Sequence, residues 1–98
     1  MIIVLAKAIP KDSKTKEKII QSAKDLIKNS KNENGNIDYN LLTNTKDNTL
    51  LFVEQWETKE ILEKHLQTPH FIKFNETITN LISSELEIKI FTAEETGL

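Results

Sequence analysis

Hydrophobic residues alternate with polar ones in some segments of the chain and recur every three or four residues in others. Residues 2–9 are short and rich in β-branched side chains, and Pro10 closes them, which predicts a strand. Residues 37–41 and 49–57 predict a hairpin, with a polar turn over 44–48, and residues 86–90 predict a last strand. Helical spacing predicts one helix after Asp12 or Ser13 and another after Thr58, which restarts at Thr68-Pro69.

The predicted order βαββαβ is typical of an α+β, ferredoxin-like fold with an antiparallel sheet, in which the first and third strands are central. These two strands have apolar residues at both alternating positions, as central strands buried on both faces do. The pattern also predicts three sets of side chains that share a face. The inward sets of the half-buried strand and of the short helix are Ile37, Tyr39 and Leu41, and Ile61, Leu62 and Leu66, whereas Phe52, Glu54 and Trp56 form a third set that shares one face of a strand with apolar groups on both faces.

The length of 98 residues indicates one domain over residues 1–98. Apolar side chains on the second face of the central strands predict a homodimer, because a monomer would expose them. The formal charge of -2 and the lack of a basic half exclude a nucleic-acid partner. The longest apolar stretch, Ile2 to Ala6, is too short to span a bilayer, and no signal-peptide pattern is present. We therefore expect no membrane association and a cytoplasmic location.

Several kinds of site have no sequence support. The chain has no cysteine, no glycine-rich phosphate loop and no HExxH motif. His65 and His70 are five residues apart across a proline, a spacing that does not place both on one helical face. A histidine could in principle converge with Glu54, but we predict neither a metal nor another cofactor.

Two side chains are candidates for acid–base chemistry. Glu54 lies in the middle of an apolar strand, where a carboxylate is costly unless it is paired. It is either a structural partner of Tyr39 or a histidine, or a tuned acid or base. His65 is either a helix-end surface group or the best general-base candidate, because the ordinary pKa of histidine is near neutrality.

Aromatic side chains surround these candidates in the sequence. Trp56 is either plain core packing or a pocket wall. Phe71 and Phe74 are core residues or the lining of an aromatic pocket. His70, in the first turn of a helix, tends to stay neutral there and is either exposed or part of the substrate site.

Two blocks of the chain resemble a known family. The segments Val53-Glu54-Gln55-Trp56-Glu57 and Leu62 to Phe71, with its H-x-x-T-P-H-F pattern, are similar to the antibiotic biosynthesis monooxygenase superfamily, above all its quinol monooxygenases. Residues 33–39 match the family's stretch before the second strand. The E-x-W and H-x-x-T-P-H-F patterns are fairly specific, whereas the rest of the likeness is hydrophobic pattern.

The resemblance implies a dimeric α+β barrel that oxygenates quinols or polyphenols with O2, without flavin, haem or metal. It implies His65 as base or proton relay and Tyr39 and Glu54 as positioning groups. Trp56, His70, Phe71 and Phe74 would then contact the small aromatic substrate.

Other members of the superfamily act differently. The branch that degrades haem uses an asparagine in the first strand and a histidine in the last long helix; residues 2–9 lack asparagine, and the helix after Phe71 has Asn75 but no histidine. An isomerase of a phosphorylated metabolite would need an anion-binding cluster, which the sequence does not offer. A dimer that binds a small ligand without turnover is the third alternative.

Overall fold

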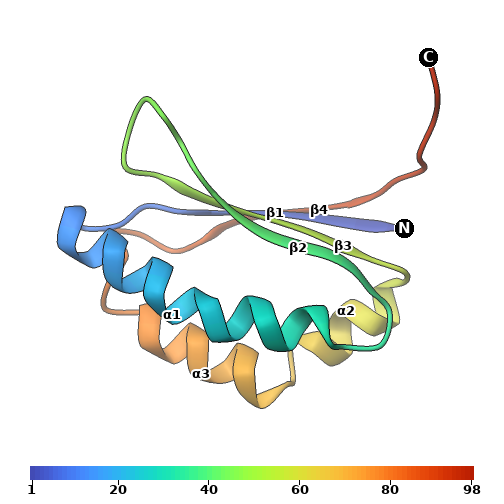
Figure 1. The fold of residues 1–98 in the computed structure, drawn as a ribbon, viewed down its shortest axis with the longest axis horizontal. Helices are drawn as coiled ribbons and strands as arrows, with labels where there is room; N and C mark the ends of the chain where they lie inside the picture. Colours follow the sequence, from blue (N-terminus) through green and yellow to red (C-terminus); the bar gives the residue numbers. More distant parts are fainter.

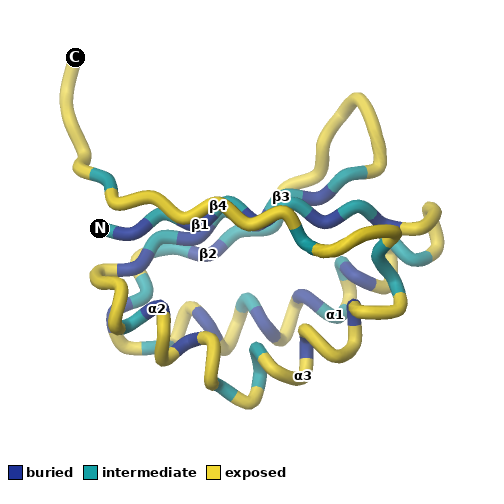
Figure 2. The backbone as a smooth tube through the Cα atoms, turned by 180° about the vertical axis from the view of Figure 1, so that it is seen from behind, coloured by how far each residue is buried: buried dark blue, intermediate teal, exposed yellow.

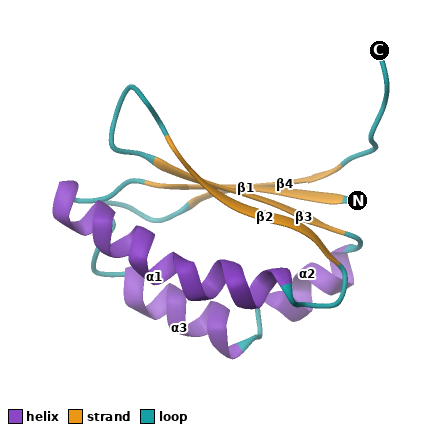
Figure 3. Ribbon diagram, viewed as in Figure 1, coloured by secondary structure: helices purple, strands orange, loops and turns teal.

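The computed structural model describes all residues from 1 to 98 and confirms the predicted element order. The second helical region is split at Thr68-Pro69, as predicted (Figure 3). The elements are β1 (Ile2–Ala8), α1 (Ser13–Lys31), β2 (Asn36–Thr43), β3 (Leu50–Trp56), α2 (Lys59–His65), α3 (Pro69–Ile78) and β4 (Glu87–Thr92).

The four strands form one antiparallel sheet in the order β2-β3-β1-β4, so β1 and β3 are central as the apolar pattern predicted. All three helices lie on one face of this sheet (Figure 1). The buried residues are concentrated where the helices and the sheet face each other (Figure 2). This α+β arrangement is the ferredoxin-like fold. No helix is long and apolar enough to cross a membrane.

Short capping signals set the helix starts. Asp12 caps α1 by accepting a hydrogen bond from the Thr15 N–H through Oδ1, at 2.8 Å, so Asp12 rather than Ser13 is the cap. Thr58 caps α2 and Thr68 caps α3, with Pro69 in the first helical turn. The cap at Thr68 starts a new helix, which carries His70, Phe71 and Phe74.

The prediction for Ile37 was wrong, because a β-bulge interrupts the alternation at the start of β2. Asn36 pairs with Trp56 and Asp38 with Gln55, so Ile37 is an extra residue and its side chain is 49% exposed. Tyr39 follows the bulge and is buried opposite Glu54. The bulge therefore determines which β2 side chain reaches the core.

Leu66, which we expected to point inward, lines the cavity described in the next subsection but is only partly covered. It follows the last residue of α2 and is 44% exposed. The last strand keeps its predicted alternation, but every residue of β4 is exposed, since α3 ends at Ile78 and β4 is an edge strand. The side of the sheet near β4 is consequently open, which matters for the cavity described next.

Candidate active site

A cavity of about 310 Å³ lies between the inner face of the sheet and the two later helices. Its walls are almost entirely apolar, and the polar side chains that face it are Tyr39, Glu54 and Asn75. The cavity is lined by Val4, Ala6, Tyr39, Phe52, Glu54, Leu62, Leu66, Phe71, Phe74, Asn75, Leu86, Ile88 and Ile90. Such a cavity suits a small apolar ligand with one hydrogen-bonding end.

Glu54 is the ionisable carboxyl group in this cavity. It lies in β3, where the residues at alternate positions from Leu50 to Trp56 are buried, and its side chain faces inward with them. Only 6% of Glu54 is exposed. The indole Nε1–H of Trp56, two residues along the same face, donates a hydrogen bond to its Oε1 at 3.0 Å. The carboxyl group is thus held in one orientation inside an apolar space.

The surroundings change the acid–base behaviour of this pair of cavity residues. Burial raises the pKa of Glu54 to about 7, although hydrogen bonding with Trp56 and Tyr39 acts in the opposite direction. Burial also raises the pKa of Tyr39, and the charge of Glu54 adds to the increase. At neutral pH Tyr39 is therefore a neutral hydroxyl, and Glu54 can both take up and release a proton.

The predicted site residues fall into two groups. Tyr39, Glu54, Phe71 and Phe74 line the cavity, whereas Trp56, His65 and His70 do not. Trp56 is fully buried and lies behind Glu54 as its hydrogen-bond donor.

Sequence reasoning missed Asn75, which also lines the cavity. Its position four residues after Phe71, on the same face of α3, was the signal that could have identified it.

His65, at the end of α2, is completely buried against aromatic rings. The centre of its ring lies 4.4 Å from that of Trp56 and 5.1 Å from that of Phe71. Its Nδ1 lies 2.6 Å from a carboxylate oxygen of Glu33, while its Nε2 has no hydrogen-bond partner. Burial lowers the pKa of His65 despite this contact, so the imidazole is neutral at pH 7.

Glu33 joins the two histidines. The same oxygen, Oε2, lies 2.8 Å from Nε2 of His70. Sequence reasoning missed this role because Glu33 is 32 residues from His65 and belongs to the loop between α1 and β2. The spacing argument considered one helical face, whereas the two histidines come from different helices.

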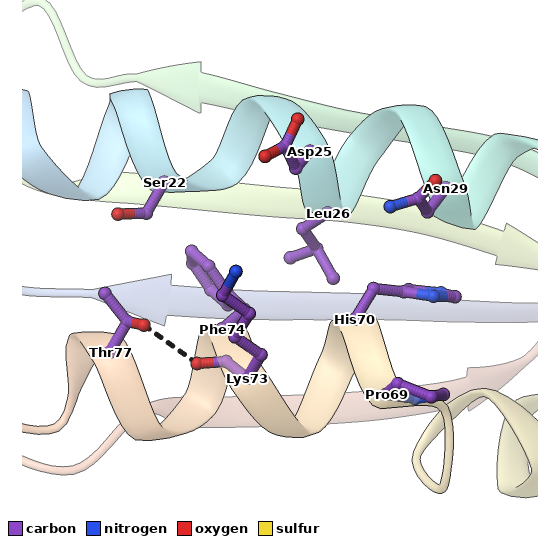
Figure 4. A pocket seen from close by; sticks show the side chains of 9 residues that line it. All are labelled: Ser22, Asp25, Leu26, Asn29, Pro69, His70, Lys73, Phe74 and Thr77. Atoms are coloured by element: carbon purple, nitrogen blue, oxygen red, sulfur yellow. Dashed lines mark hydrogen bonds between the residues drawn. The ribbon is translucent and has the colours of Figure 1, made fainter.

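By residue type, Glu33, His65 and His70 are also the group that could hold a metal, since their ligand atoms lie within 4.8 Å of one another. His70 faces a groove between α1 and α3, away from the apolar cavity (Figure 4). Trp56 therefore links two groups of ionisable side chains, because it donates a hydrogen bond to Glu54 and its ring packs against His65 of the second group.

Comparisons with known proteins agree with this fold. The family model described as antibiotic biosynthesis monooxygenase matches residues 1–77. An uncharacterized protein of Synechocystis sp., sll1783, is 37% identical over 95 residues, which cover 96% of this chain. The chain spans 65% of the length of that relative.

Two further matches extend over most of the chain. The Bacillus subtilis protein named "Putative monooxygenase YcnE" is 28% identical over 88 residues, covering 89% of this chain and 93% of that protein. The solved structure of a conserved protein from Methanosarcina mazei Go1 matches with a TM-score of 0.90 at 24% identity, over 95% of this chain and 92% of that chain. The structural likeness shows the fold, and the match to the family model shows the family. This chain belongs to the antibiotic biosynthesis monooxygenase family.

Proposed function

We propose that the protein is a monooxygenase that oxidises quinol-type aromatic substrates with O2 and needs no organic cofactor. Family membership supports a monooxygenase-like oxidoreductase, and the cavity supports the finer assignment. The observation that carries it is Glu54, a buried carboxyl group with a pKa of about 7 that faces an apolar, aromatic-walled cavity.

For this reaction the protein has to supply a base rather than a redox group. The Glu54 carboxylate takes the proton of a phenolic hydroxyl, which leaves an electron-rich quinolate. The quinolate gives one electron to O2, and the two radicals join to form a C–O bond and a peroxide. Glu54 returns its proton to the peroxide, and loss of the C–H proton from the oxygenated carbon forms the new carbonyl as the O–O bond breaks. The released hydroxide takes up that proton, so the products are water and a hydroxylated quinone. One oxygen atom of O2 is thus in the product and the other in water.

The other cavity residues position the substrate. Neutral Tyr39 and the amide of Asn75 can hydrogen-bond to substrate oxygens, and Phe71 and Phe74 provide flat apolar walls. An apolar cavity also keeps water from the carbanion-like quinolate. No lysine lines the cavity, so its surface offers little to a phosphorylated substrate of the isomerase type.

In this proposal Glu54 replaces His65 as the general base. Glu54 faces the cavity directly, whereas the buried His65 is separated from it by the aromatic rings it contacts. His65 then acts indirectly, by packing against Trp56, which in turn donates to Glu54. Trp56 and His65 are positioning residues, and His70 lies outside the substrate site.

Oxygen uptake tests the proposal. Protein treated to remove metals and flavins is mixed with a panel of dihydroxynaphthalenes and hydroquinones, and O2 consumption is compared with the autoxidation blank. Wild type should exceed the blank, with a rate that rises with pH through about 7 because the carboxylate form is active. Glu54→Gln should lose the rate, and His65→Ala should keep part of it if the protein remains folded.

Three other outcomes of the oxygen-uptake test would change the assignment. A folded wild type without uptake on any member of the panel would overturn the quinol assignment for these substrates. Binding of the same compounds without turnover, measured by quenching of Trp56 fluorescence, would identify a ligand-binding protein. Uptake that survives in Glu54→Gln but is lost in His65→Ala would return the role of base to His65.

The proposal includes a homodimer formed through the outer face of the sheet. All helices lie on the opposite face (Figure 1). Apolar side chains of the outer face are consequently partly exposed. Among them Leu5 pairs with Val53, and Ile3 pairs with Phe91. Covering these side chains with a second copy would bury the patch. Sedimentation should give a dimer for wild type and a monomer for Val53→Lys. The cytoplasmic location stays a prediction from the sequence.

A further inference from the structure

The cluster of Glu33, His65 and His70 supplies no reacting group to the proposed oxygenation, in which His65 only packs against Trp56. Its three side chains come from three separate elements, namely the loop after α1, the end of α2 and the first turn of α3. None of its three residues lines the apolar cavity, and His70 opens to the groove between α1 and α3. A cluster of this kind, outside the cavity, calls for its own explanation.

We propose that Glu33, His65 and His70 bind one divalent transition-metal ion of the zinc type. Two imidazoles and one carboxylate are a donor set that zinc and related ions use in proteins, usually with further positions left to water. The donors here are Nδ1 of His65, Nε2 of His70 and Oε2 of Glu33, all within 4.8 Å of one another.

Binding one ion would lengthen the two distances from Glu33, and it would require the two histidine nitrogens, which lie within 4.8 Å of each other, to be about 3.3 Å apart. Zinc bonds of about 2.0–2.2 Å at tetrahedral angles place neighbouring ligand atoms about 3.3 Å apart. The Glu33 oxygen is now 2.6 Å from His65 and 2.8 Å from His70, so it would have to move away by roughly 0.5–0.7 Å. The side chain of Glu33 is 15% exposed and belongs to a loop, which makes such a movement inexpensive.

The surroundings allow an ion to reach the site and complete its coordination. The side chain of His70 is 19% exposed, and Asp25 and Asn29 of α1 line the same groove (Figure 4). Water held by these oxygen-bearing side chains can occupy the remaining positions. Coordination through Nδ1 leaves the proton of His65 on Nε2, beside the rings of Trp56 and Phe71, where an N–H can interact weakly with aromatic faces.

The ion would connect the loop before β2 to α2 and α3, so its binding should stabilise the fold. Binding to the folded state alone raises the melting temperature with metal concentration. At about a hundredfold excess over the dissociation constant, a domain of this size should melt on the order of 10 °C higher. This gain does not depend on any substrate of the apolar cavity.

The test uses full-length protein without a histidine tag, freed of metal by chelation. Zn²⁺ is titrated by calorimetry, and Co²⁺ by its visible absorption, at neutral pH. We expect one ion per chain, a higher melting temperature, and the Co²⁺ spectrum of a site with mixed nitrogen and oxygen ligands. His70→Ala and Glu33→Gln should each weaken binding at least tenfold, while Glu63→Gln, a change on the exposed side of α2, should not.

Two results would overturn the proposal. One is the absence of a saturable site in wild type at metal concentrations that bind one ion per chain in other two-histidine, one-carboxylate sites. The other is unchanged affinity in both His70→Ala and Glu33→Gln, which would place the ion elsewhere. His70 is partly exposed, so its variant should fold even if Glu33→Gln does not. Because the readout is metal binding, the result is independent of oxygen uptake.

Discussion

Glu54 and Glu33 are two carboxyl groups at the ends of one chain of contacts, because Trp56 donates to Glu54, its ring packs against His65, and His65 contacts Glu33. Glu54 faces an apolar cavity, is 6% exposed and accepts a hydrogen bond from a neutral indole. Glu33 lies at the edge of the molecule, its side chain 15% exposed, and shares one oxygen between two basic imidazoles. The same chemical group therefore meets two different environments.

This comparison shows which state of a carboxyl group each environment favours. Loss of water without a basic partner favours the protonated acid, so Glu54 becomes a group that exchanges protons near neutrality. Two basic partners at a solvent-accessible edge favour an oxygen that accepts hydrogen bonds or a cation. The first arrangement is suited to proton transfer, and the second to holding its neighbours in place.

The largest expected effect concerns Glu54 and the pH dependence of stability. Its pKa rises on folding from 4.5 to about 7, so folding is favoured while the group is protonated, and that advantage is lost between about pH 4.5 and 7. This pKa change corresponds to about 3 kcal/mol in the free energy of unfolding. The glutamine in Glu54→Gln cannot ionise, so at pH 8 the free energy of unfolding of this variant should exceed that of wild type by up to about 3 kcal/mol. The same variant should lose roughly 100-fold or more of its oxygenation rate.

Urea unfolding at pH 4 and pH 8 measures this effect. Wild type and Glu54→Gln should have similar free energies of unfolding at pH 4, and the two values should diverge as the pH rises. Phe74→Leu, a change in the cavity wall without a titrating group, is the control and should keep a constant difference from wild type. A parallel pH dependence of wild type and Glu54→Gln would show that Glu54 ionises as freely as it does in the unfolded chain.

The fold was largely predictable from the sequence because its signals are local. Alternation in β1 and β3, the caps at Asp12 and Thr68, and Pro69 each act within a few residues. The exposure of Ile37 was not predictable, since the bulge at Asn36–Asp38 is defined by pairing with β3.

The candidate site was predictable only in part. Alternation alone put Glu54 beside Trp56 on a buried face, and the hydrogen bond between them follows from that proximity. Glu33 could not be found in this way, because its contacts with His65 and His70 span 32 and 37 residues. Such contacts depend on how the loop after α1 packs against the later helices.

A second, smaller effect is expected from Trp56→Phe. Its indole N–H favours the ionised form of Glu54, so removing it should raise the pKa of Glu54 above about 7. A hydrogen bond to a charged group contributes about 1.5–3 kcal/mol, which corresponds to a movement of roughly 1–2 pH units. The pH–rate profile should move to higher pH by this amount, and NMR of the ¹³C-labelled Glu54 carboxyl group should report the same movement.

The control for this variant is again Phe74→Leu, which changes the cavity wall but no hydrogen bond to Glu54. Its rate can fall, but the midpoint of its pH profile should stay in place. An unchanged midpoint in Trp56→Phe would mean that the indole packs beside the carboxyl group without tuning it, and that burial alone determines its pKa.

The smallest effect tests whether the two carboxyl groups influence each other. The negative charge of Glu33 contributes to the raised pKa of Glu54, as the weakest of its causes. Glu33→Gln should therefore lower that pKa, by roughly a few tenths of a pH unit because charges at this separation are screened. Trp56 is the only tryptophan and is hydrogen-bonded to Glu54, so its fluorescence during a pH titration reports the ionisation without any substrate. The shift should shrink at high salt and be absent in Glu63→Gln. A shift to higher pH in Glu33→Gln would mean that losing the contact with His65 disturbs the Trp56 ring, so that packing rather than charge couples the two sides.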